Sequence, residues 1–186
     1  MSYVDDLLAA YRSFVALPWQ RSLAPAQRVW MAVYPPEYER RLRLHVPAFE
    51  VATREAHHSW ALVDITTSFE RWMAAHEYRA DYFESPDLLE TALPAFFEHL
   101  IGEVSDELGE RTDPDGVVAL LGAGTLFGLG DSVKVSALLN AVNGTVAGRL
   151  LVFFPGQHEG NSYRLLDARD GWNYLAIPIT PKGNDR

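Results

Sequence analysis

Two short apolar runs in the C-terminal half of the chain stand out, because each is stopped by glycine or proline. The first reads VVALLGAG from Val117, and the second reads LLVFFPG from Leu150. Between them, apolar residues recur at helical spacing from about Asp131 to Val142. Short apolar runs are typical of strands buried on both faces, and a helix between two of them is typical of a parallel crossover. Residues 117–155 therefore predict a strand, a helix and a second, parallel strand.

The same alternation of strand and helix patterns extends through the N-terminal half of the chain. The β-rich runs RVWMAVY, from Arg28, and WALVDI, from Trp60, predict the first two strands. Apolar residues at intervals of three and four predict helices over residues 2–15, 36–57, 68–73 and 88–108.

Individual residues predict where these helices begin or break. Ser2 is expected to cap the first helix with its hydroxyl. Pro47 is expected to kink or divide the second helix, because proline removes a backbone hydrogen bond from a helix interior. Pro94 is expected to split the 88–108 segment into two pieces, the second capped by Thr91.

The last part of the chain predicts an antiparallel addition to the sheet. Residues 163–167 and 172–179 are strand-like runs around the turn sequence Arg169-Asp-Gly, which favours a β-hairpin. Strands that alternate with helices predict an α/β fold with a mostly parallel sheet. We therefore expect a single three-layer domain over residues 1–180, with helices flanking the sheet, a C-terminal antiparallel hairpin at one edge, and a polar tail over residues 181–186.

The composition is that of a globular protein and excludes several kinds of site. Of the 186 residues, 48% are hydrophobic, which is close to ordinary globular usage. The absence of cysteine excludes disulfides, thiolate nucleophiles and cysteine-ligated zinc. No apolar run approaches the roughly 20 residues that span a bilayer, and the N-terminal segment lacks the pattern of a signal peptide. We expect a cytoplasmic protein with no membrane partner.

The net charge of −9 is concentrated in one segment. Between Glu77 and Asp115 there are twelve acidic residues and two arginines, which gives this segment a net charge of −10. The chain has no large basic footprint, so we expect no direct sequence-specific binding to nucleic acid. An acidic face either keeps a protein soluble or docks a basic partner.

Glycines follow the third predicted strand in the order GxGxxxG, a variant of the dinucleotide-binding fingerprint. They are Gly122, Gly124 and Gly128. The next strand ends in Phe-Phe-Pro, with no acidic residue to bind a ribose hydroxyl. A helix that begins near Asp131 would also place a carboxylate where a pyrophosphate should bind. The sequence therefore argues against nicotinamide or flavin binding and favours a tight structural turn.

The phosphate-binding loop of ATPases and GTPases is also incomplete. The motif GxxxxGK[ST] is absent, and Asp131 stands where the phosphate-binding lysine belongs. Asp64 ends an apolar strand, as a magnesium-binding aspartate does, but a loop or capping role is common for such a residue. A degenerate nucleotide-binding site, P-loop-like but without the lysine motif, stays open as an alternative, as does a nucleic-acid-responsive regulatory domain. Its candidate residues are Gly122, Gly124, Gly128, Asp64 and His158.

Signals for hydrolytic or metal-dependent catalysis are weaker. The GxSxG elbow of serine hydrolases is absent, and the six histidines lack the spacing of metal ligands. His158 and Glu159 are the best acid–base candidates, because they follow the fourth strand at the ligand-binding edge of the sheet. His99 and Glu103 can meet on one helix face, as ordinary exposed pairs do. We expect a non-enzymatic protein with no catalytic residue, metal or cofactor.

Aromatic residues in loops, at helix starts and on edge strands favour a binding role instead. Such residues anchor protein interfaces more often than chance, although many of them cover the core locally. They are Trp19, Tyr38, Tyr82, Tyr163, Trp172 and Tyr174.

Four segments of the chain form a recognisable combination. They are LLGAGTLFG from Leu120, VSALLN from Val135, RLLVFFPGQ from Arg149, and Asn173-Tyr174. This combination resembles the BrxB family, a small component of the bacterial phage-exclusion systems called BREX. Lys134 precedes Val-Ser where the family usually has arginine, and Leu175 stands where a second tyrosine is usual.

The resemblance implies a role in defence against phage, without an established reaction. It also implies a partner in the same system, the PglZ-type phosphatase-like component. We therefore expect a non-enzymatic accessory protein of BREX defence that binds another BREX protein.

Overall fold

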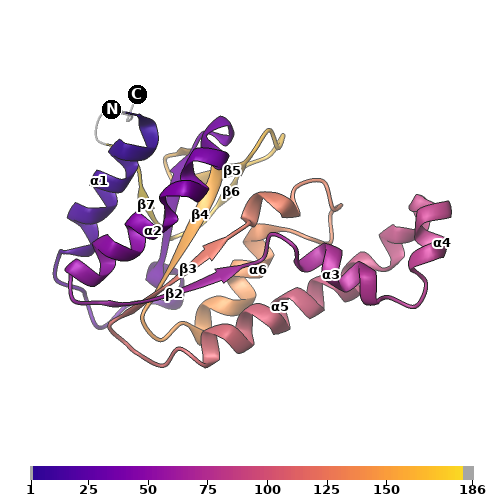
Figure 1. The fold of residues 1–186 in the computed structure, drawn as a ribbon, viewed down its shortest axis with the longest axis horizontal. Coiled ribbons are helices and arrows are strands. Elements are labelled where there is room, and N and C mark those ends of the chain that lie inside the picture. Colours follow the sequence, from indigo (N-terminus) through magenta and orange to yellow (C-terminus); the bar gives the residue numbers. More distant parts are fainter. Residues whose placement is uncertain (1, 182–186) are drawn as a thin grey trace.

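A computed structural model describes residues 2–181, and its centre is a parallel sheet with the strand order β2-β3-β4-β1-β7 (Figure 1). All neighbours along this order are parallel. The predicted α/β fold with a mostly parallel sheet is confirmed. Of the predicted polar tail, residues 182–186 lie outside the described residues. The strands are β1 (Val29–Tyr34), β2 (Ser59–Asp64), β3 (Gly116–Leu121), β4 (Arg149–Glu159) and β7 (Ile177–Ile179).

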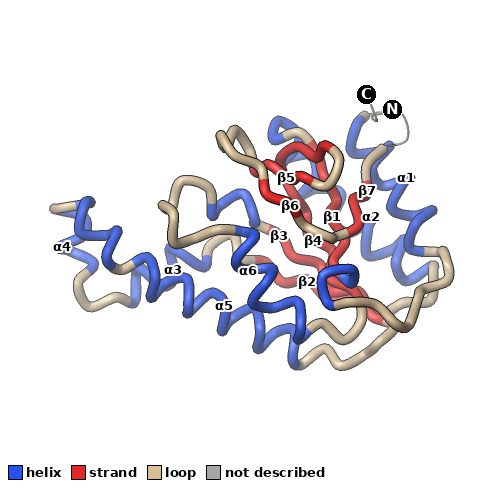
Figure 2. Tube along the Cα trace, turned by 180° about the vertical axis from the view of Figure 1, so that it is seen from behind, coloured by secondary structure: helices blue, strands red, loops and turns tan. Residues whose placement is uncertain are grey.

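Helices cover both faces of this sheet, as predicted (Figures 1 and 2). Phe153 and Phe154 are neighbours in β4, and they belong to different hydrophobic cores on opposite faces. All residues of β1 and β3 are buried, so both helical layers are needed to shield these strands from water. The layer on one face is α1 (Tyr3–Val15) and α2 (Glu39–Glu55), and the other contains α5 (Leu93–Gly109) and α6 (Val135–Val142).

The order of the strands explains why the helices divide in this way. The chain passes from β1 through α2 to β2, and it therefore crosses over β4 and β3. It then returns across the sheet, through α5 to β3 and through α6 to β4. Because parallel crossovers are right-handed, connections that run in opposite directions place their helices on opposite faces.

The start of α1 agrees with the predicted cap. Ser2 accepts a hydrogen bond from the backbone N–H of Asp5 at 3.4 Å, and its own N–H donates to the Asp5 carboxylate at 2.9 Å. This reciprocal pair is a capping box. The apolar stripe of α1 then packs on the sheet, with Leu7, Tyr11 and Val15 fully buried.

Two predictions that rest on prolines have different outcomes. α2 runs through Pro47 as one helix of 17 residues, so the predicted division is not found. Pro47 is exposed, and water can hydrate the carbonyl group that loses its hydrogen-bond donor there. The segment around Pro94 does form two pieces, but the predicted cap by Thr91 is wrong. Ala92 occupies the capping position, and the Thr91 hydroxyl donates to the carbonyl of Leu88 at 2.7 Å.

The predicted start of the crossover helix is also wrong. α6 begins at Val135, and Asp131 lies in the exposed loop that precedes it. The side chain of Asp131 forms an ion pair with Lys134 at 3.5 Å instead of facing the first turn of the helix.

The C-terminal hairpin is present, but it is attached differently from the prediction. β4 continues beyond Pro155, and β5 (Ser162–Leu165) folds back antiparallel on this extension. β6 (Trp172–Asn173) then pairs antiparallel with β5. The predicted strand over residues 172–179 is thus divided, because its second half forms β7 and pairs in parallel with β1. The hairpin stands at the carboxyl end of the sheet, and β7 forms the edge.

An arm projects from the body between β2 and α5 (Figures 1 and 2). We define the arm as residues 76–91, which contain α4 (Arg79–Glu84) and a 3₁₀ helix (Pro86–Thr91), and neither element has a buried residue. The arm follows α3 (Ser68–Ala75), whose Phe69 ring packs edge-on against Phe96 of α5 at 5.1 Å. Further 3₁₀ turns are Pro25–Arg28, Pro36–Tyr38, Ala123–Leu126 and Asn143–Thr145.

Candidate functional site

The loops that follow β1, β2, β3 and the middle of β4 converge at the carboxyl edge of the sheet. They surround a cavity of about 470 Å³. Open α/β sheets bind their ligands at this edge, where neighbouring connections leave toward opposite faces. The cavity is lined by Pro36, Glu39, Arg43, Thr66, Gly124, Thr125, Pro155 and Leu166.

Two of the three predicted glycines bring the loops of this edge close together. Gly122 has a φ angle of 101°, which favours glycine. A Cβ atom at Gly122 would lie 2.6 Å from the backbone nitrogen of Thr66, in the loop after β2. A Cβ atom at Gly124 would lie 3.0 Å from the ring of Pro155. The space at these glycines is thus occupied by the protein's own chain.

Gly128 lies apart from the other two glycines. It lines a different cavity, of about 420 Å³, between the loop before α6 and the segment that carries Asp170 and leads into β6. Gly122, Gly124 and Gly128 therefore do not surround one ligand position, as the glycines of a dinucleotide fingerprint do.

Asp64 is held by its own loop. Its carboxylate accepts hydrogen bonds from the backbone N–H of Thr66, at 2.9 Å, and from the Thr66 hydroxyl. These bonds are those of an aspartate that closes a turn at the end of a strand. Both bonds end on Oδ1 of Asp64, so the turn uses only one of the two carboxylate oxygens.

His158 lies on the extension of β4, beyond the residues that line the cavity at the carboxyl edge. It is paired across the strands with Tyr163, and the two ring centroids are 4.6 Å apart. The structure therefore does not bring His158 together with Asp64 and Gly124 around one cavity. Nor do His99 and Glu103 form a pair, because Glu103 binds Arg71 of α3.

A hydrogen-bonded network that the sequence did not single out lies beside the same cavity, and two of its members, Glu39 and Arg43, line it. The Tyr34 hydroxyl donates to the carboxylate of Glu39 at 2.5 Å, and Nε of Arg43 donates to the other oxygen at 2.7 Å. Burial, together with the contact with Glu39, raises the pKa of Tyr34 far above its ordinary value. Tyr34 is therefore a neutral donor. The sequence did contain a signal for this network, because Tyr34 ends a predicted strand and Glu39 and Arg43 follow one turn apart on the next helix.

The charges around the cavity do not favour a phosphate group. The one guanidinium in its lining, on Arg43, is compensated by Glu39, and Asp64 adds a carboxylate next to Thr66. Phosphate sites instead combine arginine or lysine with free backbone N–H groups.

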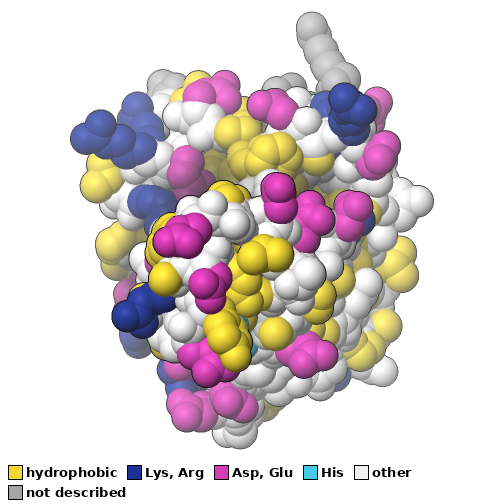
Figure 3. Space-filling model, turned by 90° about the vertical axis from the view of Figure 1, so that its right-hand side faces the viewer, with side chains coloured by type: hydrophobic (Ala, Val, Ile, Leu, Met, Phe, Trp, Pro, Cys, Tyr) yellow, Lys and Arg dark blue, Asp and Glu magenta, His cyan; other side chains and the backbone are white. Residues whose placement is uncertain are grey.

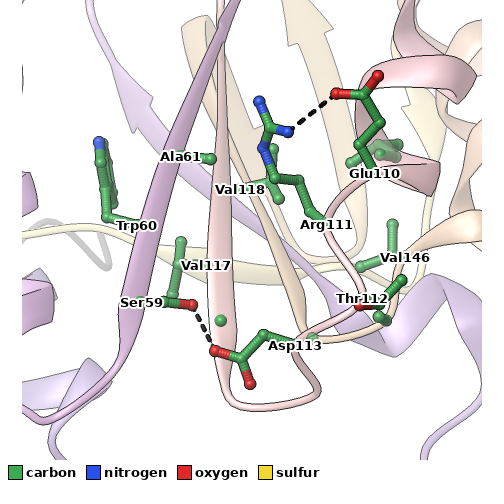
Figure 4. A pocket seen from close by; sticks show the side chains of 14 residues that line it. Ser59, Trp60, Ala61, Glu110, Arg111, Thr112, Asp113, Val117, Val118 and Val146 are labelled. Carbon is green, nitrogen blue, oxygen red and sulfur yellow. Dashed lines mark hydrogen bonds and ion pairs between the residues drawn. The ribbon is translucent and has the colours of Figure 1, made fainter.

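Another cavity, of about 310 Å³, lies at the opposite edge of the sheet (Figure 4). Figure 4 shows that the charged side chains of its lining each contact another polar side chain of the same wall. The Ser59 hydroxyl donates to Asp113 at 2.5 Å, and Arg111 binds Glu110 at 3.2 Å. The remaining wall is largely apolar, with side chains such as Val118 and Val146. The carboxylates of Asp113 and Glu110 are therefore already bound by other side chains of this cavity.

Within residues 2–181, no group of three or more histidine, aspartate and glutamate side chains is arranged to hold a metal ion. None of the helices in this part of the chain combines the length and the apolar character that crossing a bilayer requires.

The arm presents the most distinctive surface of the protein (Figure 3). Figure 3 faces the side from which the arm projects and shows apolar side chains surrounded by acidic ones. Phe83 is 75% exposed, Tyr78 is 53% exposed and Leu88 is 49% exposed. The sequence indicated that this segment is acidic and that Tyr82 could anchor an interface. It did not indicate the projection, because projection from the body depends on contacts between distant elements. The acidic side chains of the arm are Glu77, Asp81, Glu84, Asp87 and Glu90.

Comparisons of the chain with protein-family models, curated proteins and solved structures found no match. We therefore base the functional proposal on the residues and the geometry of this chain.

The Ser59–Asp113 pair gives a testable pH dependence. The Ser59 hydroxyl and the backbone N–H of Asp115 donate to Asp113 and hold the pKa of that carboxyl below its ordinary value. A lowered folded-state pKa stabilises the protein above the unfolded pKa of about 3.9, and this contribution is lost as the pH falls through the folded-state pKa. Ser59→Ala is expected to reduce the free energy of unfolding at pH 7, by at most about 1 kcal/mol because the pair is exposed.

The measurement is urea unfolding of wild type and Ser59→Ala between pH 7 and about pH 2. The difference between the two proteins is expected to shrink toward the acid end. A difference that stays constant over this range would show that the hydroxyl acts through packing and not through the carboxylate.

Proposed function

We propose that this protein is a non-enzymatic binding component of a BREX-type defence system and acts in the bacterial cytoplasm. The observation that carries the binding role is the arm, which places exposed apolar side chains on a projection with no core of its own. The BREX assignment rests on the resemblance to the BrxB family. By the same resemblance, the partner that we propose is the PglZ-type phosphatase-like protein.

The arm has the properties of a protein-binding surface. Exposed apolar side chains gather there with a polar rim, as they do at the anchors of protein interfaces. Neither α4 nor the 3₁₀ helix contributes a buried residue, so packing of the body does not account for Phe83 or Leu88. Burial of such side chains against a partner would contribute about 25 cal/mol for each Å² of apolar surface.

The segments that carry the family resemblance lie elsewhere, in the sheet and in its last crossover. They form β3 with the turn after it, α6, β4 and β6. These segments build the core and the carboxyl edge, so they support the proposed family. The arm supports the proposed binding role.

A nucleotide- or nucleic-acid-responsive domain is the competing function. The observation that favours it is the cavity of about 470 Å³ at the carboxyl edge, with the Arg43 guanidinium and the Thr66 and Thr125 hydroxyls in its wall. We rank it second, because Glu39 compensates Arg43 and because Asp64 already accepts two hydrogen bonds from Thr66.

The binding function is tested by affinity purification of the tagged chain from cells that express the whole defence locus. The PglZ-type protein is expected to co-purify with wild type. Phe83→Ala is expected to reduce its recovery about tenfold, because loss of an anchoring aromatic side chain commonly costs this much affinity or more. Leu44→Ala is the matched control, since Leu44 is also 75% exposed but lies on α2.

Wild type that recovers no BREX protein would contradict the proposed function. Equal losses for Phe83→Ala and Leu44→Ala would show that the arm has no special part in binding.

ATP with magnesium is expected to leave the melting temperature of the wild-type protein unchanged. Thermal unfolding with and without the nucleotide measures this, with Asp64→Ala as the comparison variant. A rise of several degrees that Asp64→Ala abolishes would establish the competing function.

A further inference from the structure

We propose that a cavity on the arm receives an arginine side chain of the partner protein. This inference rests on the proposed binding function, and it specifies the chemistry of the contact. The cavity measures about 340 Å³ and lies between α4 and the 3₁₀ helix that follows it. Tyrosine rings and carboxylates line it together, which is the combination that holds a guanidinium group.

The tyrosine rings of the cavity are supported from the side of the body. Tyr78 and Tyr82 both line the cavity and lie one helical turn apart. The centroid of the His76 ring lies 6.0 Å from that of Tyr78, 5.2 Å from that of Tyr82 and 4.8 Å from that of Trp72. The backbone N–H of Tyr78 also donates to Nδ1 of His76 at 3.2 Å. These contacts orient the two tyrosines before a partner arrives, which reduces the ordering that binding requires.

The carboxylates of the arm are not used by the protein itself. Asp81 and Glu84 line the cavity. Within residues 2–181, no ion pair involves any of the five arm carboxylates, whereas acidic residues such as Glu39, Glu50 and Glu107 are paired with arginines. The one arginine of the arm, Arg79, donates to the carbonyl of Ala74 at 2.9 Å. The arm thus has an excess of negative charge that a basic partner would complement.

Arginine fits this arrangement better than other groups do. Its planar guanidinium can stack on a tyrosine ring while its fork of N–H groups donates to two carboxylates. Lysine supplies the charge without the planar fork. Phosphates, nucleic acids and anionic lipid surfaces would be repelled by Asp81, Glu84 and the acidic residues around them. Phe83 and Leu88 lie exposed on the same arm and would contact apolar residues next to the arginine.

The probe for this inference is a fluorescein-labelled hexapeptide of alternating leucine and arginine, titrated with the full chain. Fluorescence anisotropy is expected to show saturable binding to wild type. The double variant Asp81→Asn, Glu84→Gln is expected to bind the peptide about tenfold more weakly, because it removes both carboxylates of the cavity. Glu98→Gln is the matched control, since Glu98 is an exposed acid on α5, and its affinity is expected to equal that of wild type.

A second peptide with lysine in place of arginine tests the planar contact. It is expected to bind wild type about threefold more weakly than the arginine peptide, and Tyr82→Leu is expected to remove that difference. Equal affinity of the two peptides for wild type would overturn the choice of arginine. Absence of binding to wild type, or equal binding to the double variant, would overturn the cavity as a binding site.

The same double variant in affinity purification separates the two proposals. Loss of the PglZ-type protein with this variant is the expected result. If recovery equals that of wild type while Phe83→Ala loses the partner, the cavity inference is wrong and the binding function stands. If wild type recovers no partner, the proposed function is wrong, and peptide binding alone then decides on the cavity.

Discussion

The structure depends on the fact that β1, β3 and the sheet portion of β4 have no face in contact with water. Such strands are stable only between two helical layers, so the chain must cross the sheet in both directions. This path brings the loops after the strands to one edge and also sends a long connection from β2 to α5. Within that connection, α3 and α5 contribute buried residues to the body, whereas no residue of the arm is buried.

Most of the fold follows from the sequence, because buried parallel strands and amphipathic helices have different periodicities. The apolar runs at Val117 and Leu150 become β3 and the first part of β4. The ends of elements are less predictable. Asp131 and Thr91 are residue types that commonly cap the start of a helix, yet Lys134 and Ala92 occupy the capping positions. Caps depend on where packing allows the helix to begin, and a single residue type does not determine this.

The candidate sites were predictable only in part. The sequence predicts that Asp64 and Gly124 lie at the carboxyl edge of the sheet, and the structure places them there. The network of Tyr34, Glu39 and Arg43 forms because the end of β1 lies against the start of α2. Residue spacing along the sequence does not predict such a contact. The acidity of the arm was visible in the sequence. Its projection and its exposed Phe83 depend on tertiary contacts.

Photo-crosslinking in living cells can show whether the arm contacts a BREX protein, as we propose. The photoreactive amino acid p-benzoylphenylalanine replaces Phe83 in one strain and Leu44 in another, in cells that carry the whole defence locus. Both positions are equally exposed. We expect a crosslink from position 83 to the PglZ-type protein and none from position 44. A crosslink from position 44 alone, or from neither position, would contradict this proposal.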